Sequence, residues 1–391
     1  MILPGATIGC LGGGQLGRML GIEARRLGYG FRVFEPAADC PAAQVSDHWM
    51  RAAYHDDEAL DAFASSVDVV TFEFENIPST TVNRLAQAAP VFPSAEVLHT
   101  TQNREREKNF LKSNGFPHAA FRVVTDLASL ERAVKELGRP CVLKTADFGY
   151  DGKGQVKITM ETPLNEAWSG FEGKRAVLEE WVDFELECSV VCARTAKGEV
   201  GCFPAAENIH TRHILDFSMV PGRFSAGTAR RAQDLARAVT EQLGVVGMLG
   251  VEMFLDRAGD LRVNELAPRT HNSGHFTLDA CVTSQFEQQI RAICGLPMGG
   301  SLGDSSSDFS LRSPVVMVNL LGDLWRPNVP DWSLLMRQPG VRLHLYGKAE
   351  ARPGRKMGHF CVLDSSLDSA LALAHSLKNS LSDPSSEPSA T

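Results

Sequence analysis

The first hundred residues alternate between short apolar runs and amphipathic segments. Apolar runs at Ala6–Leu11, Phe31–Glu35 and Val67–Phe74 predict three strands. The spacing of apolar residues over Leu16–Leu27 predicts a helix, which a glycine-rich turn at Gly12–Gly17 joins to the first strand. Strand–helix–strand order of this kind indicates a parallel sheet with crossover helices.

Beyond residue 103 the pattern changes to a smaller unit that mixes helices and strands. Residues 104–138 predict two helices that flank a short strand. The apolar segments Pro140–Lys144 and Gln155–Ile158 predict two further strands, and the glycine-rich segment Gly149–Gly154 between them predicts a mobile loop.

From about residue 186 the chain is rich in predicted strands. The strands are expected near residues 186–193, 199–204, 249–255 and 261–266, with one long helix among them at Thr228–Leu243. Residues 299–308 are rich in Gly and Ser and predict a surface loop. These changes of pattern predict domains at residues 1–103, 104–185 and 186–378, followed by a disordered tail at 379–391.

Composition narrows the class of protein. Of the 391 residues, 43% are hydrophobic and 22% are charged, which is typical of a globular protein of two or three domains. A net charge of −8 argues against a nucleic-acid partner, and the chain lacks the apolar run of about 18 residues that a membrane helix needs. Nine cysteines without a C-x-x-C pair, and an N-terminus without a basic leader, indicate a cytoplasmic protein with reduced thiols.

The first glycine-rich turn has the spacing of a dinucleotide-binding loop. Gly12, Gly14 and Gly17 form G-x-G-x-x-G between a strand and a helix, and Glu35 ends the next strand. An NAD-linked oxidoreductase is therefore the alternative interpretation from a different class. A tight strand-to-helix turn needs glycines even when it binds no ligand, so the motif alone is a weak signal.

A second glycine-rich segment lies between two predicted strands. Its glycines allow backbone N–H groups to face an anion, and Lys153 adds positive charge. Lys144, at the end of the preceding strand, is placed to reach a nucleotide phosphate. An ordinary hairpin loop after a strand-end lysine would give the same pattern.

A predicted β-hairpin places two glutamates opposite each other. If its turn is centred between residues 258 and 259, Glu252 pairs with Glu265, and Phe254 pairs with Val263. Two facing carboxylates repel each other, so the pairing favours a divalent cation between them. Magnesium prefers such oxygen ligands together with substrate phosphates. A bulge that shifts the pairing, or exposure of both glutamates to solvent, would remove the repulsion and with it the argument for a cation.

Two polar segments follow the hairpin. Leu266–His275 carries Arg269 in a position to stabilise a developing anion. The basic turn Arg352–Lys356, with Lys348 upstream, suits a substrate phosphate, although a solvated charge run would look alike. Together these features predict an enzyme that binds phosphate groups and magnesium and stabilises a developing anion.

Six motifs match one enzyme family in sequence order, across residues from about 5 to 365. They are GGGQLGRML (Gly12–Leu20), TFEFENI (Thr71–Ile77), GYDGKGQ (Gly149–Gln155), NELAPRTHNSGH (Asn264–His275), VVMVNLLG (Val315–Gly322) and RPGRKMGH (Arg352–His359). On these motifs the chain resembles the 5-(carboxyamino)imidazole ribonucleotide synthases, which are ATP-grasp enzymes of purine biosynthesis.

The resemblance implies a fold and a reaction. The fold would be an ATP-grasp fold of mixed α/β and α+β class, with an N-terminal Rossmann-like parallel sheet, a central lid domain and a C-terminal, mostly antiparallel sheet domain. ATP would activate bicarbonate as carboxyphosphate, and the amine of 5-aminoimidazole ribonucleotide would capture the carboxyl group, with release of ADP and phosphate. The resemblance also implies Mg²⁺, with Mn²⁺ as a substitute, a homodimer, and a separate mutase for the next step.

The resemblance assigns site residues by matching position. The nucleotide would contact Arg104, Lys144, Gly149, Tyr150, Asp151, Gly152, Lys153, Gly154, Gln155, Glu179, Glu180, Trp181, Val182, Glu187, His210, Asn264 and Glu265. Magnesium would be bound by Glu252 and Glu265. The imidazole nucleotide would contact Glu73, Tyr150, Asp151, Arg269, His271, Asn272, Lys348 and Arg355. Of these, the residues expected to act in catalysis are Glu73, Asp151, Arg269 and His271.

Another ATP-grasp ligase, such as a formate-using transformylase or a biotin carboxylase, is the alternative within the same chemistry. The acceptor-side motifs NSGH and RPGRK argue against it. One departure from the family pattern is Ala146-Asp147, because many relatives carry basic residues between the strand lysine and the glycine loop.

Overall fold

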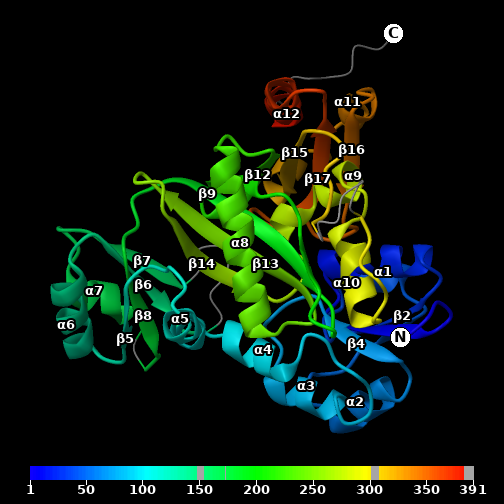
Figure 1. Ribbon diagram of the computed structural model, residues 1–391, viewed down its shortest axis with the longest axis horizontal. Coiled ribbons are helices and arrows are strands. Elements are labelled where there is room, and N and C mark those ends of the chain that lie inside the picture. Colours follow the sequence, from blue (N-terminus) through cyan, green and yellow to red (C-terminus); the bar gives the residue numbers. More distant parts are fainter. Residues whose placement is uncertain (148–153, 172, 301–307, 383–391) are drawn as a thin grey trace.

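The computed structural model describes residues 1–147, 154–171, 173–300 and 308–382 (Figure 1). Its strands form a four-stranded parallel sheet, a four-stranded antiparallel sheet and a nine-stranded antiparallel sheet. In Figure 1 the small antiparallel sheet projects to the left of the large one, and the parallel sheet lies at the lower right. An ATP-grasp architecture with these sheets is the fold that the resemblance implied.

The N-terminal sheet is parallel, as predicted. Its strands β1 (Thr7–Leu11), β2 (Gly30–Phe34), β3 (His48–Met50) and β4 (Val69–Phe72) lie in the order β3-β2-β1-β4. The helical segments around it are α1 (Gln15–Arg26), η1 (Pro41–Val45), α2 (Asp57–Ala64), α3 (Ser79–Leu85) and α4 (Ala95–Thr101). Strand β3 was not predicted, because three residues are too few to show a period.

The predicted third strand is too long at its carboxyl end. Strand β4 stops at Phe72, so Glu73 lies just beyond it. In a parallel sheet the carboxyl ends of the strands meet at one edge, where ligands bind in α/β folds. The turn after β1 and Glu73 after β4 therefore lie side by side.

The small antiparallel sheet has the order β5-β8-β6-β7. Its elements, with the helix that precedes them, are α5 (Arg104–Ser113), β5 (Phe121–Val124), α6 (Leu127–Leu137), β6 (Cys141–Thr145), β7 (Gln155–Ile158), α7 (Leu164–Ser169) and β8 (Ala176–Glu180). The two helices around a short strand that residues 104–138 predict are confirmed. The predicted loop at Gly149–Gly154 lies, except for Gly154, outside the described residues.

The large sheet has the order β14-β13-β9-β11-β12-β15-β17-β16, with β10 beside β9. Its strands are β9 (Phe184–Arg194), β10 (Val200–Cys202), β11 (Ala206–Thr211), β12 (Ile214–Val220), β13 (Gly247–Asp256), β14 (Leu261–Ala267), β15 (Val315–Leu321), β16 (Val341–Leu345) and β17 (Lys356–Leu363). The helical segments are α8 (Ala226–Leu243), η2 (Asn272–Gly274), α9 (Thr277–Ala280), α10 (Gln285–Ile293), η3 (Gly322–Trp325), α11 (Ser333–Met336) and α12 (Leu367–Ser382). Helix α8 lies across β9 and β13, where it covers their apolar face (Figure 1).

The register of the β13–β14 hairpin confirms one predicted pair and corrects the other. Glu252 pairs with Glu265 as predicted, but Phe254 pairs with Arg262, and Val263 is buried in the core beneath α8. The turn is centred on residue 258, half a residue earlier than expected, which moves the pairing of the strands by one residue, and a bulge beside Glu252 restores the pairing of the two glutamates. Because the bulge adds one residue to β14, Asn264 and Glu265 both face the same cavity.

Helix α12 corrects the boundary of the predicted disordered tail. It continues to Ser382, so residues 379–382 are helical, and residues 383–391 lie outside the described part of the chain. Ala370, Ala374, Leu377 and Leu381 form its buried stripe at helical spacing, against β15 and β17. Leu381 is only 7% exposed, which explains why the helix extends past residue 378.

Helix α10 joins the N-terminal sheet to the large sheet. Its residues Phe286, Ile290 and Ile293 are buried in one cluster with Ile8 and Leu16. In Figure 1, α10 lies beside α1 at the edge of the parallel sheet. The N-terminal hundred residues therefore share their core with residues far along the chain.

The cysteines of the chain are all buried. The described residues include all nine cysteines, and each is a buried thiol without a disulfide. Among the helices of the described residues, none has the length and apolar character to cross a membrane.

Candidate functional site

One cavity of about 860 Å³ lies between the three sheets. The turn after β1 and the loop after β4 line one end, the β13–β14 hairpin lines the middle, and strands β6, β7, β11 and β12 line the other end. Its volume is in the range of ordinary ligand pockets. The predicted site residues that line it are Glu73, Arg104, Lys144, Gln155, Trp181, Glu187, His210, Glu252, Asn264, Glu265, Arg269, His271 and Asn272.

The remaining predicted residues are placed differently. Gly149, Tyr150, Asp151, Gly152 and Lys153 lie outside the described residues. Within the described chain, the residues that do not line the cavity are Gly154, Glu179, Glu180, Val182, Lys348 and Arg355.

The two facing glutamates have opposite electrostatic surroundings. Burial acts to raise the pKa of Glu252, but His271 Nε2, 3.0 Å from Glu252 Oε1, and nearby positive charges lower it to about 2. Burial raises the pKa of Glu265 despite Arg104, whose Nη1 lies 3.6 Å from Glu265 Oε2, and the charge of Glu252 adds to the rise. A cation near both carboxylates would offset this repulsion.

The carboxylate pair fits a magnesium ion that arrives with a nucleotide. In the described part of the chain, no group of three or more His, Cys, Asp or Glu forms a complete metal cage. Magnesium commonly uses one or two carboxylates and fills its other positions with water and phosphate oxygens. Glu252 and Glu265 provide two such ligands on neighbouring strands.

A buried cluster of charges supports Lys144 beside the pair. Lys144 Nζ lies 2.9 Å from Glu179 Oε2, and Lys108 Nζ lies 3.6 Å from the same oxygen. Burial acts to raise the pKa of Glu179, but Lys108, Lys144 and Arg104 lower it to about 2. The side chain of Glu179 is therefore a counter-ion that holds Lys144 in place.

Apolar and aromatic side chains form the wall at the same end. Val142, Phe184 and Leu215 line the cavity, together with Trp181. Phe184 stacks on Phe254 with ring centroids 4.7 Å apart, and Lys157 Nζ lies 3.5 Å from the centre of the Trp181 ring. Flat apolar walls beside a lysine are suited to the base and phosphates of a nucleotide.

The neighbouring acidic residues have different partners. Glu180 Oε1 accepts hydrogen bonds from the Ala120 N–H (2.8 Å) and Arg262 Nη1 (2.9 Å), so its side chain faces away from the cavity. Glu187 Oε2 lies 2.6 Å from His210 Nδ1 inside the cavity. Burial acts to lower the pKa of His210, but Glu187 raises it overall.

The first glycine turn is filled by the protein's own carboxylates. Gly14 N–H and Gly17 N–H donate to Glu73 at 2.6 and 3.0 Å, and Gly13 N–H donates to Glu35 at 3.0 Å. These are the N–H groups that would face the pyrophosphate of a dinucleotide. The Glu73 carboxylate occupies that position, which argues against the NAD-linked alternative.

The polar run after β14 is held rigidly around Arg269. Arg269 forms a bidentate ion pair with Glu75, at 2.6 and 2.7 Å. The Gln285 side chain accepts from the His271 N–H and donates to the His271 carbonyl, at 2.7 and 2.8 Å. Asn272 is nine-tenths buried beside the cavity, and neither of its side-chain polar atoms has a partner among the described residues. An amide placed in this way has donors and acceptors available for a ligand.

Lys348 and Arg355 lie beyond the glycine end of the cavity. Lys348 Nζ donates to the Lys356 carbonyl at 2.7 Å, and Arg355 Nη2 lies 2.8 Å from Asp39 Oδ2. Burial and the charge of Arg355 lower the pKa of Lys348 to about 8, against the attraction of Glu73. The basic turn is thus folded toward the N-terminal sheet.

The sequence interpretation missed several residues of the cavity. Glu75, Lys157 and Lys356 line the cavity, and Lys108 forms an ion pair with Glu179, the counter-ion of Lys144. Glu75 is two residues after Glu73 in TFEFENI, and this alternation in the motif was the available signal. Lys108 had no such signal, because a lysine on an amphipathic helix usually faces solvent.

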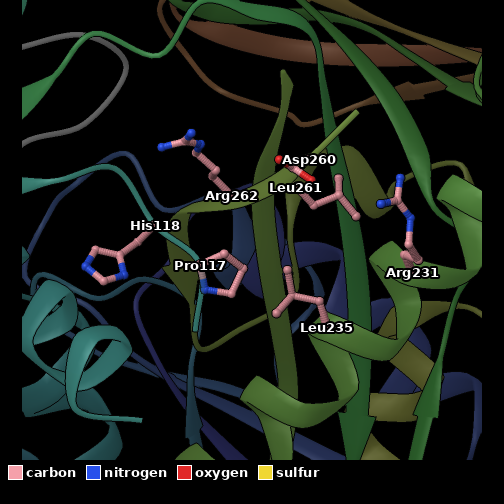
Figure 2. A pocket seen from close by; sticks show the side chains of 7 residues that line it. All are labelled: Pro117, His118, Arg231, Leu235, Asp260, Leu261 and Arg262. Carbon is pink, nitrogen blue, oxygen red and sulfur yellow. The ribbon is translucent and has the colours of Figure 1, made fainter. Parts of the chain in front are cut away.

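A second, more open hollow of about 420 Å³ contains none of the predicted site residues (Figure 2). It lies between α8, the β14 end of the hairpin and the segment that leads from α5 to β5. Its lining residues are Pro117, His118, Arg231, Leu235, Asp260, Leu261 and Arg262. Asp260 is the one carboxylate in this lining, so the hollow lacks the paired acids of the larger cavity.

Three family descriptions match consecutive parts of the chain. Residues 5–102 match the ribonucleotide synthetase preATP-grasp domain, and residues 109–286 match the ATP-grasp domain. Residues 315–373 match the phosphoribosylaminoimidazole carboxylase C-terminal domain.

Similar proteins cover nearly the whole chain. The N5-carboxyaminoimidazole ribonucleotide synthase of Bacillus subtilis (strain 168) is 46% identical over 363 residues, 93% of each chain. The enzyme of the same name from Brucella melitensis is 45% identical over 91% of this chain and 96% of its own. A solved ADP complex of an N5-carboxyaminoimidazole ribonucleotide synthetase superimposes with a TM-score of 0.89, at 44% identity and 97% coverage of both chains. The Aspergillus clavatus enzyme in complex with ADP and 5-aminoimidazole ribonucleotide gives a TM-score of 0.87, at 31% identity and 96% and 98% coverage.

Proposed function

The chain belongs to the N5-carboxyaminoimidazole ribonucleotide synthase family, and on that premise we propose that it carboxylates 5-aminoimidazole ribonucleotide with ATP and bicarbonate. The observation that carries the proposal is the large cavity, in which a carboxylate pair separates two chemically different ends. One end has Lys144 and the flat apolar walls, which suit ATP. The other end has Glu73, Glu75 and Arg269, which suit a small amine that carries a phosphate.

The residues of the cavity suit a two-step reaction. In the first step a bicarbonate oxygen attacks the γ-phosphorus of ATP, and ADP leaves. In the second step the amine nitrogen bonds to the carboxyl carbon and gives up a proton. The bond from that carbon to the phosphate oxygen breaks, and phosphate leaves with the electron pair and takes up the proton. Arg269 would stabilise the anion, and Glu73 would orient the amine. Asp151 and Tyr150, which the family resemblance also places here, lie outside the described residues.

The nucleotide would be bound at the end that contains Lys144, Trp181 and Glu187. Lys144 and Arg104 would contact the phosphates, and the apolar wall would contact adenine. Glu252 and Glu265 would hold Mg²⁺, or Mn²⁺ in its place. When bound, the cation would neutralise charge on the phosphates.

The domain boundaries and biological setting are part of the same proposal. The domains would comprise residues 1–103, 104–185 and 186–378. The family resemblance supports a cytoplasmic homodimer whose product passes to a separate mutase. Light scattering of the purified protein would test whether it is a dimer, because a monomer and a dimer differ twofold in mass.

Phosphate release tests the reaction directly. Purified protein with ATP, Mg²⁺ and bicarbonate should release phosphate much faster when 5-aminoimidazole ribonucleotide is added. The carboxylated nucleotide should form in equal amount. Phosphate release that does not respond to the ribonucleotide would contradict the proposed acceptor.

A further inference from the structure

Glu75 and Arg269 form an ion pair between two parts of the fold. Glu75 follows β4 of the N-terminal sheet, and Arg269 follows β14 of the large sheet. Glu75 Oε2 lies 2.6 Å from Arg269 Nε, and Glu75 Oε1 lies 2.7 Å from Arg269 Nη2. Both side chains line the large cavity. A bidentate pair of this kind fixes the plane of the guanidinium as well as its position.

The pair leaves part of the guanidinium available. Arginine has five N–H donors. Glu75 takes two of them, and the Thr270 carbonyl takes a third from Nη1 at 3.2 Å. Among the contacts that the described residues make, one N–H on Nη1 and one on Nη2 remain. Two such groups match the two oxygens of a carboxylate or a phosphate.

Glu75 is held in its ionised form by the same contact. Burial acts to raise the pKa of Glu75, but the charge and hydrogen bonds of Arg269 lower it overall. The neighbouring Glu73 is bound to the glycine turn, so alternate glutamates of one segment hold two different elements. A full negative charge beside Arg269 also balances its positive charge when no anion is bound.

We propose that Glu75 is a positioning residue, which orients Arg269 so that its two remaining N–H groups face the reacting anion. The inference rests on the proposed function. A misdirected guanidinium would stabilise carboxyphosphate and the departing phosphate less well. Carboxyphosphate that is not captured breaks down to CO₂ and phosphate, so phosphate release would continue while carboxylation failed.

Glu75→Gln tests this role, because glutamine keeps one acceptor oxygen but loses the charge and one of the two bonds. We expect kcat for carboxylation to fall by about tenfold to a hundredfold, with little change in the KM for ATP. The ratio of carboxylated product to phosphate should fall well below the wild-type ratio. Glu75→Asp keeps the charge on a shorter side chain and should recover part of that ratio.

Glu207→Gln is the matched control. Glu207 is a buried glutamate whose oxygens also bind an arginine, Arg223, but it lies outside the cavity lining. Its substitution should lower thermal stability without changing the ratio of product to phosphate. If both variants lowered the ratio equally, the effect of Glu75 would be general destabilisation, and the inference would be wrong.

A double-mutant cycle with Arg269→Lys completes the test. Once Arg269 is replaced, Glu75→Gln should reduce the product-to-phosphate ratio little further, because it acts through that guanidinium. Additive losses in the two variants would contradict the inference. So would a wild-type ratio of carboxylated product to phosphate in the Glu75→Gln single variant. Wild-type protein that releases no phosphate in response to the ribonucleotide would instead contradict the proposed function.

Discussion

Glu252 and Glu265 face each other across β13 and β14, yet their surroundings shift their pKa values in opposite directions. His271 keeps Glu252 ionised, whereas Glu265 is crowded by the charge of Glu252 in a buried position. Two carboxylates in one buried site resist being ionised together. A divalent cation would stabilise both carboxylates in their ionised forms. Each carboxylate should therefore be needed for turnover.

Replacing either carboxylate should stop turnover and preserve the fold. Glu252→Gln and Glu265→Gln each remove one negative charge from the site proposed for Mg²⁺–ATP, and we expect kcat to fall by about a hundredfold or more. Turnover as a function of magnesium concentration measures this, with circular dichroism to check the fold. Near-normal turnover in either variant would contradict the metal assignment.

Lys348 and Arg355 should act on the acceptor and not on ATP. Each charge-assisted bond to a phosphate contributes roughly 1.5–3 kcal/mol, so Lys348→Ala or Arg355→Ala should raise the KM for 5-aminoimidazole ribonucleotide by about tenfold or more. The KM for ATP should barely change. Because the pKa of Lys348 is about 8, kcat/KM for the ribonucleotide should also decline as the pH rises above that value, when the lysine loses its proton.

The dephosphorylated nucleoside is the control for these two substitutions. It lacks the group that the lysine and arginine would hold, so it should be a poor substrate of the wild-type protein. The substitutions should weaken its binding little further. An equal loss of ATP binding would show that both residues belong to the nucleotide end.

Most of the site could be predicted because its residue types fall in motifs, whereas their exact partners could not. The pairing of Glu252 with Glu265 was predicted from a turn centred half a residue too late, which shifts the strand pairing by one residue, and the bulge compensates for that shift. A bulge depends on packing against both faces of a strand, which one sequence does not display. Glu75 and Lys108 were missed because their partners lie more than 70 residues away.

At the scale of elements, the glycine turn and the start of α1 bind the carboxylate of Glu73. The N–H groups of Gly14 and Gly17 fix both oxygens of Glu73 at the start of the helix, where a negative charge is favoured. The glycine spacing that resembles a dinucleotide site is thus used within the protein. The sequence motif predicts the turn correctly, but the carboxylate that occupies the turn belongs to the residue after β4, about 60 residues later.

Gly14→Ala should therefore impair the acceptor end. A Cβ at Gly14 would lie 2.6 Å from Glu73 Oε1, so the carboxylate must move and lose its bonds to the turn. We expect the KM for 5-aminoimidazole ribonucleotide to rise by about tenfold, with little change in the KM for ATP. The control is Gly227→Ala in α8, where the nearest atom to a Cβ is 3.6 Å away. Unchanged kinetics in Gly14→Ala would contradict the holding role of the turn.

Other elements show why boundaries were less predictable than their type. Helix α8 was predicted within two residues of its observed start, because its apolar period is long and clear. The disordered tail was predicted to begin at residue 379, inside helix α12, since the serine-rich composition of the last helical turn hides the buried Leu381. Tertiary packing decides such ends.

At the scale of the whole molecule, three stacked histidines make stability depend on pH. His359 lies between His344 and His275, with ring centroids 4.5 and 4.8 Å apart, and His359 and His275 are fully buried. Burial lowers the pKa of both well below the ordinary value, and the charges of neighbouring histidines add to the shift. Both are therefore neutral in the folded protein.

Acidification should destabilise the protein through these groups. An unfolded histidine binds its proton near pH 6.5, while the folded pair resists protonation, so stability should fall as the pH drops below about 6.5. Denaturant unfolding at several pH values measures the slope, to which each histidine contributes up to about 1.4 kcal/mol per pH unit. His359→Gln should make the slope shallower, and the same change at the exposed His99 should not. An identical slope in all three proteins would contradict the assignment.

The core that α10 shares with the N-terminal sheet has a consequence for folding during synthesis, because the chain emerges from its N-terminus. Ile8, Leu16 and their neighbours complete their burial only against Phe286, Ile290 and Ile293. Helix α10 begins at Gln285, so roughly 180 residues must be added after the N-terminal sheet has left the ribosome, which takes about 10–40 s at ordinary rates. During that interval the part of this cluster that α1 does not cover remains exposed to water. The newly made N-terminal segment should therefore depend on chaperones that bind apolar surfaces until α10 arrives.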